Sequence, residues 1–434
     1  MKILILLCFI FPMSLSSQTR QLIDTSDYAT RNQVIKNLES RYSSLNSKIR
    51  DTYNGKMKRE MEAIYEASQN HFLESIKHKK FIFNSEFNTY LDSLGLQIQT
   101  KYPTLKNSNL IFFLSKDPIP NAFCLGDHTF VVNLGLFTIF DNEHEFLSVL
   151  THEVAHQLLE HGKKSIENKA VTNINYLDRK SSTVRSLSKE QYNRGLKSFS
   201  ILKSLLYEQG EVKRKHETEA DSLGYLIYKS LDSHKMDYIH SLDKLVLMDS
   251  VPSIEVSKSI YKTVFDLPSL PFDEAWFKSE SFDNYNYDFY TEKITKDSIS
   301  SHPETVDRIQ HLKSIFPELN EDSEAETASS TFLNLQKLAI QSKVENLFYL
   351  NEYGLSVYLI LYRLQHDIDV DYCKAWLGIN FKALYEAKKN YQLNRYLDRV
   401  VPKEQSESYQ QFLNFMWNLK LSELKEISEY YALD

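Results

Sequence analysis

The stretch Glu143–Gly162 reads EHEFLSVLTHEVAHQLLEHG, and the rest of the chain is organised around it. Within it, residues 152–156 fit the pattern H-E-x-x-H. Positions four apart lie on the same face of a helix, so the imidazoles of His152 and His156 can both bind one zinc ion. Glu153 lies between them, close enough to act as a general base beside the metal. The stretch therefore predicts a metal site on a helix.

The same stretch has the pattern of a buried helix. Apolar side chains recur at helical spacing, at Phe146, Leu147, Val149, Leu150, Val154, Leu158 and Leu159. We expect Asn142, with Glu145 three positions later, to cap the start of this helix. Gly162 is a natural place for it to end.

A third metal ligand has to come from another element. On a continued helix, His161 would lie about 180° around the axis from His152, and Glu160 about 12 Å along it. The best candidates are Glu217 and Asp221 in HETEADSLG, residues 216–224, which are again four positions apart. One carboxylate can bind zinc while the other accepts the N–H of a ligating histidine.

Residues 216–224 also have features of an exposed helix. Glu219 projects about 200° away from Glu217 and is expected to be a solvent-exposed or salt-bridged residue. Taken alone, the whole patch could be an ordinary acidic surface helix.

Together these motifs resemble the gluzincin metallopeptidases, which include CAAX prenyl proteases, the heat-shock membrane protease HtpX and periplasmic relatives. Asn121-Ala122-Phe123, with Gly135-Leu136 downstream, is similar to the N-A-F…G-L stretch of that family. Ser301-His302-Pro303 with Arg308 is similar to its [ST]-H-P-x-x-x-x-R segment. The resemblance covers residues 87–315.

The resemblance implies a role for each matching residue. One zinc ion per chain would be held by His152, His156 and Glu217, with Glu153 as general base. Asp221 would orient a ligand histidine, His302 would be an extra ligand in a resting state or a transition-state donor, and Arg308 would brace that segment or the site. Asn121, Ala122 and Phe123 would belong to the edge that holds an extended substrate. Leu125-Gly126 replaces the Pro-Gly of the family, which leaves the shape of that edge open.

The fold class that we expect is α+β and mainly helical, because the chain contains only 10 Gly and 10 Pro in 434 residues. Tyr90, Leu91, Leu94 and Leu96 favour a helix, and residues 110–114 favour a strand. Residues 121–126 are expected to form a turn, and residues 130–136 a second strand. This predicts a zincin-type metallopeptidase domain with a short β-sheet beside the active helix.

The chain divides into five predicted regions. Residues 1–17 have the positive start, short apolar run and small residues of a signal peptide. Residues 18–85 are a helical lead-in, 86–316 the peptidase domain, 317–330 a polar linker and 331–434 a helical C-terminal region. Within the domain, residues 163–215 are predicted to form a basic helical insertion. This insertion is either a lid that controls access to the site or a solvent-exposed helical segment without such a role. Cys124 and Cys373 give no disulfide framework, although one bridge between them stays open.

These features predict an exported, zinc-dependent metalloendopeptidase that hydrolyses protein substrates. We expect it to be periplasmic, secreted or associated with the cell envelope, with a role in the quality control of envelope proteins. The net charge of −7 gives no reason to expect nucleic acid, and no other run reaches the length of a membrane span. The helical C-terminal region is either a site for a protein partner or a part that completes the fold. Two alternatives are a chaperone or adaptor with a gated or vestigial metal site, and a structural metal-binding protein. The intact Glu153 argues against the first, because a purely structural zinc site has no use for that base, and the second leaves the two downstream motifs unexplained.

Overall fold

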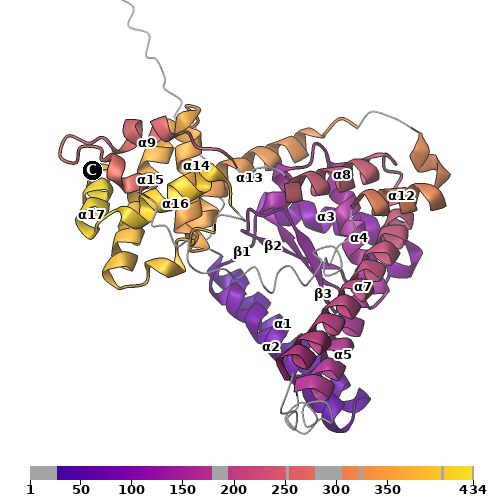
Figure 1. The fold of residues 1–434 in the computed structure, drawn as a ribbon. Coiled ribbons are helices and arrows are strands. Elements are labelled where there is room, and N and C mark those ends of the chain that lie inside the picture. Colours follow the sequence, from indigo (N-terminus) through magenta and orange to yellow (C-terminus); the bar gives the residue numbers. More distant parts are fainter. Residues whose placement is uncertain are drawn as a thin grey trace, which may run out of the picture.

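The computed structural model describes residues 27–177, 194–250, 254–278, 305–321, 326–401 and 405–432. The predicted signal peptide and His302 lie outside these residues. The described chain forms two lobes, one containing the sheet and one built from helices (Figure 1). It is 72% helical with a single four-stranded sheet in the described part, which confirms the predicted fold class.

The sheet has the strand order β1-β2-β4-β3. Strands β2 (Ile111–Ser115) and β4 (Thr129–Asn133) are parallel, and β1 (Phe81–Ile82) pairs with β2 in the antiparallel sense. Strand β3 (Ala122–Gly126) forms an antiparallel hairpin with β4 and is an edge of the sheet.

The hairpin corrects two predictions. Residues 122–126 are a strand rather than a turn, and the turn consists of Asp127 and His128, both with positive φ (51° and 57°). Two left-handed residues match the twist of a hairpin, so the chain reverses without a glycine in the two-residue loop. Leu134–Thr138 is a 3-10 helix (η2) rather than the end of the second strand.

Helices cover both faces of the sheet and position the candidate site. On one face, α1 (Tyr28–Thr52) and α2 (Gly55–Lys77) form the expected helical lead-in, and Leu38 and Phe72 pack with Phe113 and Val131 of the sheet. The other face packs with α3 (Glu86–Lys101) and α4 (Glu143–Leu158) in the largest apolar core.

Helix α4 carries the H-E-x-x-H residues. It packs along α7 (Arg194–Lys229) and α8 (Asp237–Ser250), while α5 (His161–Thr172) and the short π-helix η3 (Asn173–Leu177) follow α4 and pack on α2. Asn142 caps α4 as predicted, since its Oδ1 accepts hydrogen bonds from the backbone N–H groups of His144 and Glu145. The side chain of Glu145 bonds to Asp141 instead of completing a capping box.

The helical lobe contains α14 (Tyr353–Gln365), α15 (Val370–Lys389), α16 (Glu407–Asn418) and α17 (Leu421–Tyr430). It also contains α9 (Lys258–Phe265) and the 3-10 helix η4 (Glu274–Phe277). This segment lies within the predicted 86–316 domain but packs in the other lobe, because Tyr261, Phe265 and Trp276 are buried against Phe415.

Three further elements, α12, η5 and α13, lie between η4 and α14 in the described part of the chain. Helix α12 (Thr305–Ile315) returns to the sheet lobe, followed by the 3-10 helix η5 (Pro317–Asn320). Helix α13 (Ser330–Tyr349) then joins the lobes: Phe332 and Leu335 belong to the core of the sheet lobe, and Val344 and Leu347 to the helical core. Across the described part of the chain, no helix is both long and apolar enough to cross a membrane. Cys124 and Cys373 are free thiols.

Candidate metal centre

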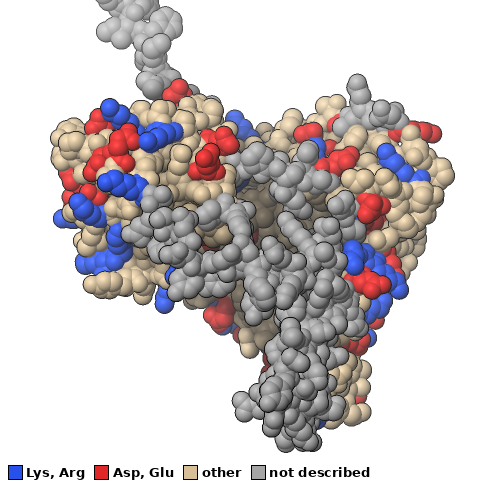
Figure 2. All heavy atoms as spheres, viewed as in Figure 1, with Lys and Arg blue, Asp and Glu red and all other residues tan. Residues whose placement is uncertain are grey.

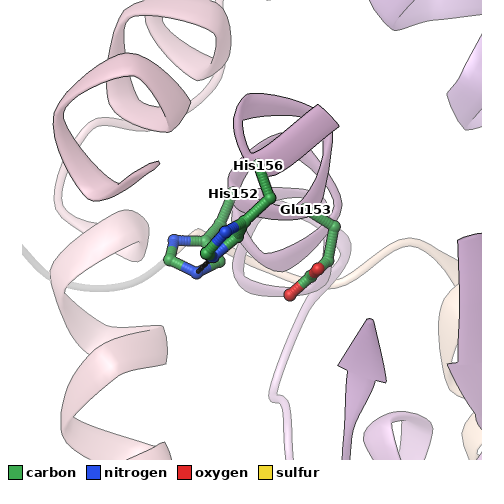
Figure 3. A group of neighbouring side chains, drawn as sticks. All are labelled: His152, Glu153 and His156. Carbon is green, nitrogen blue, oxygen red and sulfur yellow. Dashed lines mark hydrogen bonds between the residues drawn. The ribbon is translucent and has the colours of Figure 1, made fainter. Parts of the chain in front are cut away.

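His152 and His156 lie one turn apart on α4 and point to the same side of the helix (Figure 3). Their Nε2 atoms are 3.0 Å apart. Both rings are mostly buried, with 13% and 16% of the side chain exposed. The helix therefore presents two imidazole nitrogens to one point in space.

Helix α7 brings Glu217 to the same point. Its Oε2 lies 3.4 Å from His152 Nε2, and its Oε1 lies 3.6 Å from His156 Nε2. Zinc bonds of about 2.0–2.1 Å in a tetrahedral arrangement place neighbouring ligand atoms about 3.3 Å apart. The spacing of these three side chains thus fits a divalent ion such as zinc.

Asp221, one turn further along α7, lies behind His152. Its Oδ1 is 2.9 Å from His152 Nδ1, and its two oxygens accept hydrogen bonds of 2.7 and 2.6 Å from Nε and Nη2 of Arg308 on α12. The side chains of Asp221 and Arg308 are 1% and 9% exposed. A buried, bidentate pair of this kind holds the carboxylate in one orientation, which in turn fixes the ring of His152.

The carboxylates favour positive charge at this point. Burial lowers the pKa of His152, but the bonds to Asp221 and Glu217 outweigh it and raise that pKa to about 10. Burial and the neighbouring His152 lower the pKa of His156 to about 3. The two carboxylates on α7 thus make this point favourable for one cation.

Glu153 extends from the same helix beside the two histidine rings (Figure 3), and one of its carboxylate oxygens lies within 4.8 Å of a ring nitrogen of each histidine. Burial is the main cause that raises its pKa to about 7, while the backbone N–H of Cys124 on β3 acts in the opposite direction. A carboxyl group with this pKa can accept and return a proton near neutral pH.

The site opens into a cavity of about 710 Å³. Its walls include Asn121, Ala122 and Phe123 at the start of β3, the two histidines, Glu217 and Arg308. Among the described residues, β3 pairs with β4 alone, and Phe123 is 40% exposed. The predicted edge residues and the predicted metal ligands thus border one cleft. His302 lies outside the described residues, so its position stays a prediction.

The model of peptidase family M48 matches residues 88–316, more than half of the chain. The chain belongs to peptidase family M48. Three curated relatives are each 30% identical over 79 residues, or 18% of this chain: the Beta-barrel assembly-enhancing proteases of Escherichia coli (strain K12), Shigella flexneri and Escherichia coli O157:H7. The aligned part spans only 16% of the length of each relative.

One residue of the M48 site was assigned wrongly from the sequence. Helix α4 ends at Leu158, two residues before Glu160 in the left-handed conformation (φ 55°), and α5 begins at His161. Because the chain turns here, His161 does not face away: its Nδ1 lies 2.9 Å from His156 Nδ1. The helix also ends before Gly162, the predicted stop. The left-handed residue is a glutamate, so the sequence has no glycine or proline at the point where α4 ends and the chain turns into α5.

Glu219 has the role that its direction on the helix suggested. It lies within salt-bridge distance of His161 and of Lys215, with its side chain 39% exposed. Cys124, on the edge strand, contacts Gln157 through its Sγ atom, and burial raises the pKa of its thiol to about 12. A thiol with this pKa is a poor metal ligand and a poor nucleophile.

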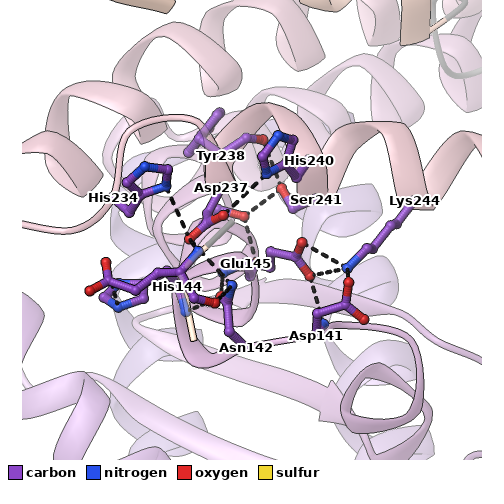
Figure 4. Close-up of polar contacts among 12 residues, drawn as sticks. Asp141, Asn142, His144, Glu145, His234, Asp237, Tyr238, His240, Ser241 and Lys244 are labelled. Atoms are coloured by element: carbon purple, nitrogen blue, oxygen red, sulfur yellow. Dashed lines mark hydrogen bonds and ion pairs between the residues drawn. The ribbon is translucent and has the colours of Figure 1, made fainter. Parts of the chain in front are cut away.

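A second group of acidic and histidine side chains lies at the start of α4 (Figure 4). Glu145, Asp237 and His240 are close enough to hold an ion, but Lys244 Nζ lies 2.7 and 2.5 Å from the two oxygens of Glu145. The ammonium group of Lys244 therefore already supplies the positive charge that a metal ion would bring to Glu145. Asp237 in turn accepts from Asn142, so this network joins the start of α4 to α8.

Proposed function

We propose that this M48 peptidase is a zinc-dependent endopeptidase that hydrolyses protein substrates. His152, His156 and Glu217 would hold the ion. The observation that carries the proposal is the convergence of these three side chains, with separations of 3.0, 3.4 and 3.6 Å between their ligand atoms. A purely structural ion would have no use for Glu153 beside it.

The residues around the ligands have separate tasks in the proposed reaction. Bound zinc would supply Lewis acidity to the scissile carbonyl group and to water. Glu153 would take the proton of the attacking water and pass it to the leaving amine, for which a pKa of about 7 is well matched. Arg308 already donates two hydrogen bonds to Asp221 and is 8% exposed, which favours bracing over transition-state donation. His302 would be the remaining candidate donor to the oxyanion.

The cleft suits an extended polypeptide. A peptide lying along the free side of β3 could add a strand by backbone hydrogen bonds, which would fix its scissile bond beside Glu153 without demanding one sequence. Binding through the backbone does not require a chain terminus, and this supports internal cleavage.

We further propose that the protein is exported and acts on proteins of the cell envelope. The signal-peptide pattern of residues 1–17 supports export, and the relatives are named for enhancing the assembly of β-barrels. The helical lobe would bind a partner or substrate protein. Lys, Arg, Asp and Glu are interspersed over its visible face (Figure 2), which offers both signs of charge to such a partner. The alternative is an adaptor whose helical lobe carries the function.

Hydrolysis by the full chain tests the proposal. The protein is incubated with an unfolded model protein, and fragments are identified by mass spectrometry. We expect internal cleavage, loss of activity with a chelator, and recovery when zinc is returned. Activity that survives complete removal of metal would contradict the proposal, and release of terminal residues alone would contradict endopeptidase action.

A further inference from the structure

We infer that His161 is a positioning residue that holds the ring of His156, and that it links this ring to the carboxylate of Glu219. The inference rests on the proposed function, because it takes His156 as a zinc ligand. It assigns to the second ligand histidine a support that differs from the direct contact between Asp221 and His152.

The contacts form a chain of three side chains. His161 Nδ1 lies 2.9 Å from His156 Nδ1, and His161 Nε2 lies 3.1 Å from Glu219 Oε2. His156 Nε2 is the atom that faces His152 and Glu217. Each nitrogen of the two rings is therefore directed at a specific partner.

Proton counting gives one arrangement. When His156 uses Nε2 for a metal, its Nδ1 carries the proton and must donate it. His161 Nδ1 is then the acceptor, and the proton of the neutral His161 ring is on Nε2, from which it is donated to Glu219. The negative charge of Glu219 thus stabilises, through one neutral ring, the tautomer of His156 that binds a cation.

The surroundings hold His161 in this orientation. Only 3% of the residue is exposed, and the ring of His216 stacks on it with centroids 4.0 Å apart and planes 10° apart. Residues 216 and 219 lie on α7, the helix that also supplies Glu217. The sharp break at Glu160 is what brings His161 back toward the site, so the break has a consequence for the metal centre.

The test measures zinc affinity, so it does not depend on catalysis. The full chain and its variants are compared for the Kd of Zn²⁺, by competition with a chelator, and for the thermal midpoint of the metal-free protein. His161→Phe keeps a ring against His216 but has no acceptor. His161→Asn places a carbonyl oxygen near the position of Nδ1 and restores an acceptor. Absorption spectra of Co²⁺-loaded proteins report whether the geometry at the metal changes.

We expect His161→Phe to raise the Kd about 10- to 100-fold, the usual effect of losing such a partner, and His161→Asn to recover most of the affinity. Glu219→Gln should raise the Kd less than His161→Phe does, because Glu219 contacts His161 and reaches His156 only through that ring. Glu160→Gln makes the same charge change nearby, on a side chain that is 60% exposed and pairs with Lys163, and should leave the Kd unchanged.

Two results would overturn the inference while leaving the proposed function standing. In the first, His161→Phe lowers the thermal midpoint of the metal-free protein but binds Zn²⁺ as tightly as the parent. In the second, the Asn variant is as weak as the Phe variant, so that the acceptor is not the cause. Absence of zinc binding by the parent would overturn the inference and the proposed metal site together.

Discussion

Gly224 of α7 lies directly against the backbone of His152 on α4. A Cβ atom at position 224 would come within 2.9 Å of His152 Cα and 2.7 Å of the hydroxyl oxygen of Tyr238. Both distances are shorter than side chains tolerate, and a backbone atom cannot move aside on its own. Gly224, the last residue of the segment HETEADSLG, therefore sets how closely α7 approaches the turn of α4 that carries His152.

We predict that Gly224→Ala weakens the metal centre. The added methyl group would push α7 away from α4, and Glu217 and Asp221 would move with it. A shift of a few tenths of an ångström is enough to lengthen the contacts to both histidines, so the Kd for Zn²⁺ should rise about tenfold or more. Isothermal titration with zinc measures this directly.

The matched control is Gly162→Ala. A Cβ atom at Gly162 would meet no heavy atom within 4 Å, and the residue lies in the first turn of α5. Alanine there should leave the free energy of unfolding unchanged or raise it by up to about 1 kcal/mol. Equal zinc affinity of the parent and the Gly224 variant would show that the close approach is not functionally required.

Arg308→Lys should be strongly disruptive although it conserves charge. Lysine cannot reproduce the two parallel hydrogen bonds to Asp221, whose carboxylate is 1% exposed and also holds His152. We expect a loss of about 1–3 kcal/mol in the free energy of unfolding, together with weaker zinc binding. Denaturant unfolding of the metal-free protein separates the first effect from the second.

Arg50→Lys provides the comparison for that experiment. Arg50 is 44% exposed and lies 3.9 Å from Glu62, so its loss should cost less than about 0.5 kcal/mol. If the two Arg→Lys variants had the same stability and the same zinc affinity, the bracing role of Arg308 would be wrong.

Lys116 is a buried cation away from the metal site, and its removal should stabilise the protein. It is 1% exposed and lies over the ring of Tyr349, with Nζ 5.1 Å from the centroid. Burial is the main cause that lowers the pKa of its ammonium group to about 8, and Arg31 adds to the effect. We expect Lys116→Met to raise the free energy of unfolding at pH 7 by about 1–3 kcal/mol.

The pH dependence gives this prediction a clear sign. The folded state releases the proton of Lys116 near pH 8, whereas the unfolded chain releases it near its ordinary pKa of 10.5. The penalty for burying the charge is therefore complete below pH 8 and fades as the pH rises toward 10.5. The advantage of Lys116→Met should shrink over that range in denaturant titrations. An advantage that is constant, or that grows with pH, would contradict this interpretation.

The residues of α4 and α7 could be predicted because their geometry is local. Two side chains four positions apart on a helix share a face in almost any fold, which applies both to His152 with His156 and to Glu217 with Asp221. That Glu217 meets the histidine Nε2 atoms, while Asp221 meets Nδ1 of His152, depends on how α7 packs against α4. Spacing alone left that assignment open.

The differences arose where one residue's backbone conformation redirects the chain. Glu160 adopts a left-handed conformation that turns His161 toward His156. Asp127 and His128 are also left-handed, and they reverse the chain between β3 and β4. Nothing in these residue types demands such a conformation. The segment 254–278 shows a second kind of difference, because helical spacing indicates which face of α9 is apolar but not which lobe buries it.

Glu153→Gln tests the proposed mechanism most directly. The substitution keeps the size of the side chain and removes its ability to accept a proton, while His152, His156 and Glu217 are untouched. The parent and the variant, both as full chains shown to hold one zinc ion, are compared for cleavage of the same unfolded protein. We predict cleavage by the parent and a loss of at least about 10²-fold in the variant. Equal rates with equal zinc content would contradict the assignment of Glu153 as the base.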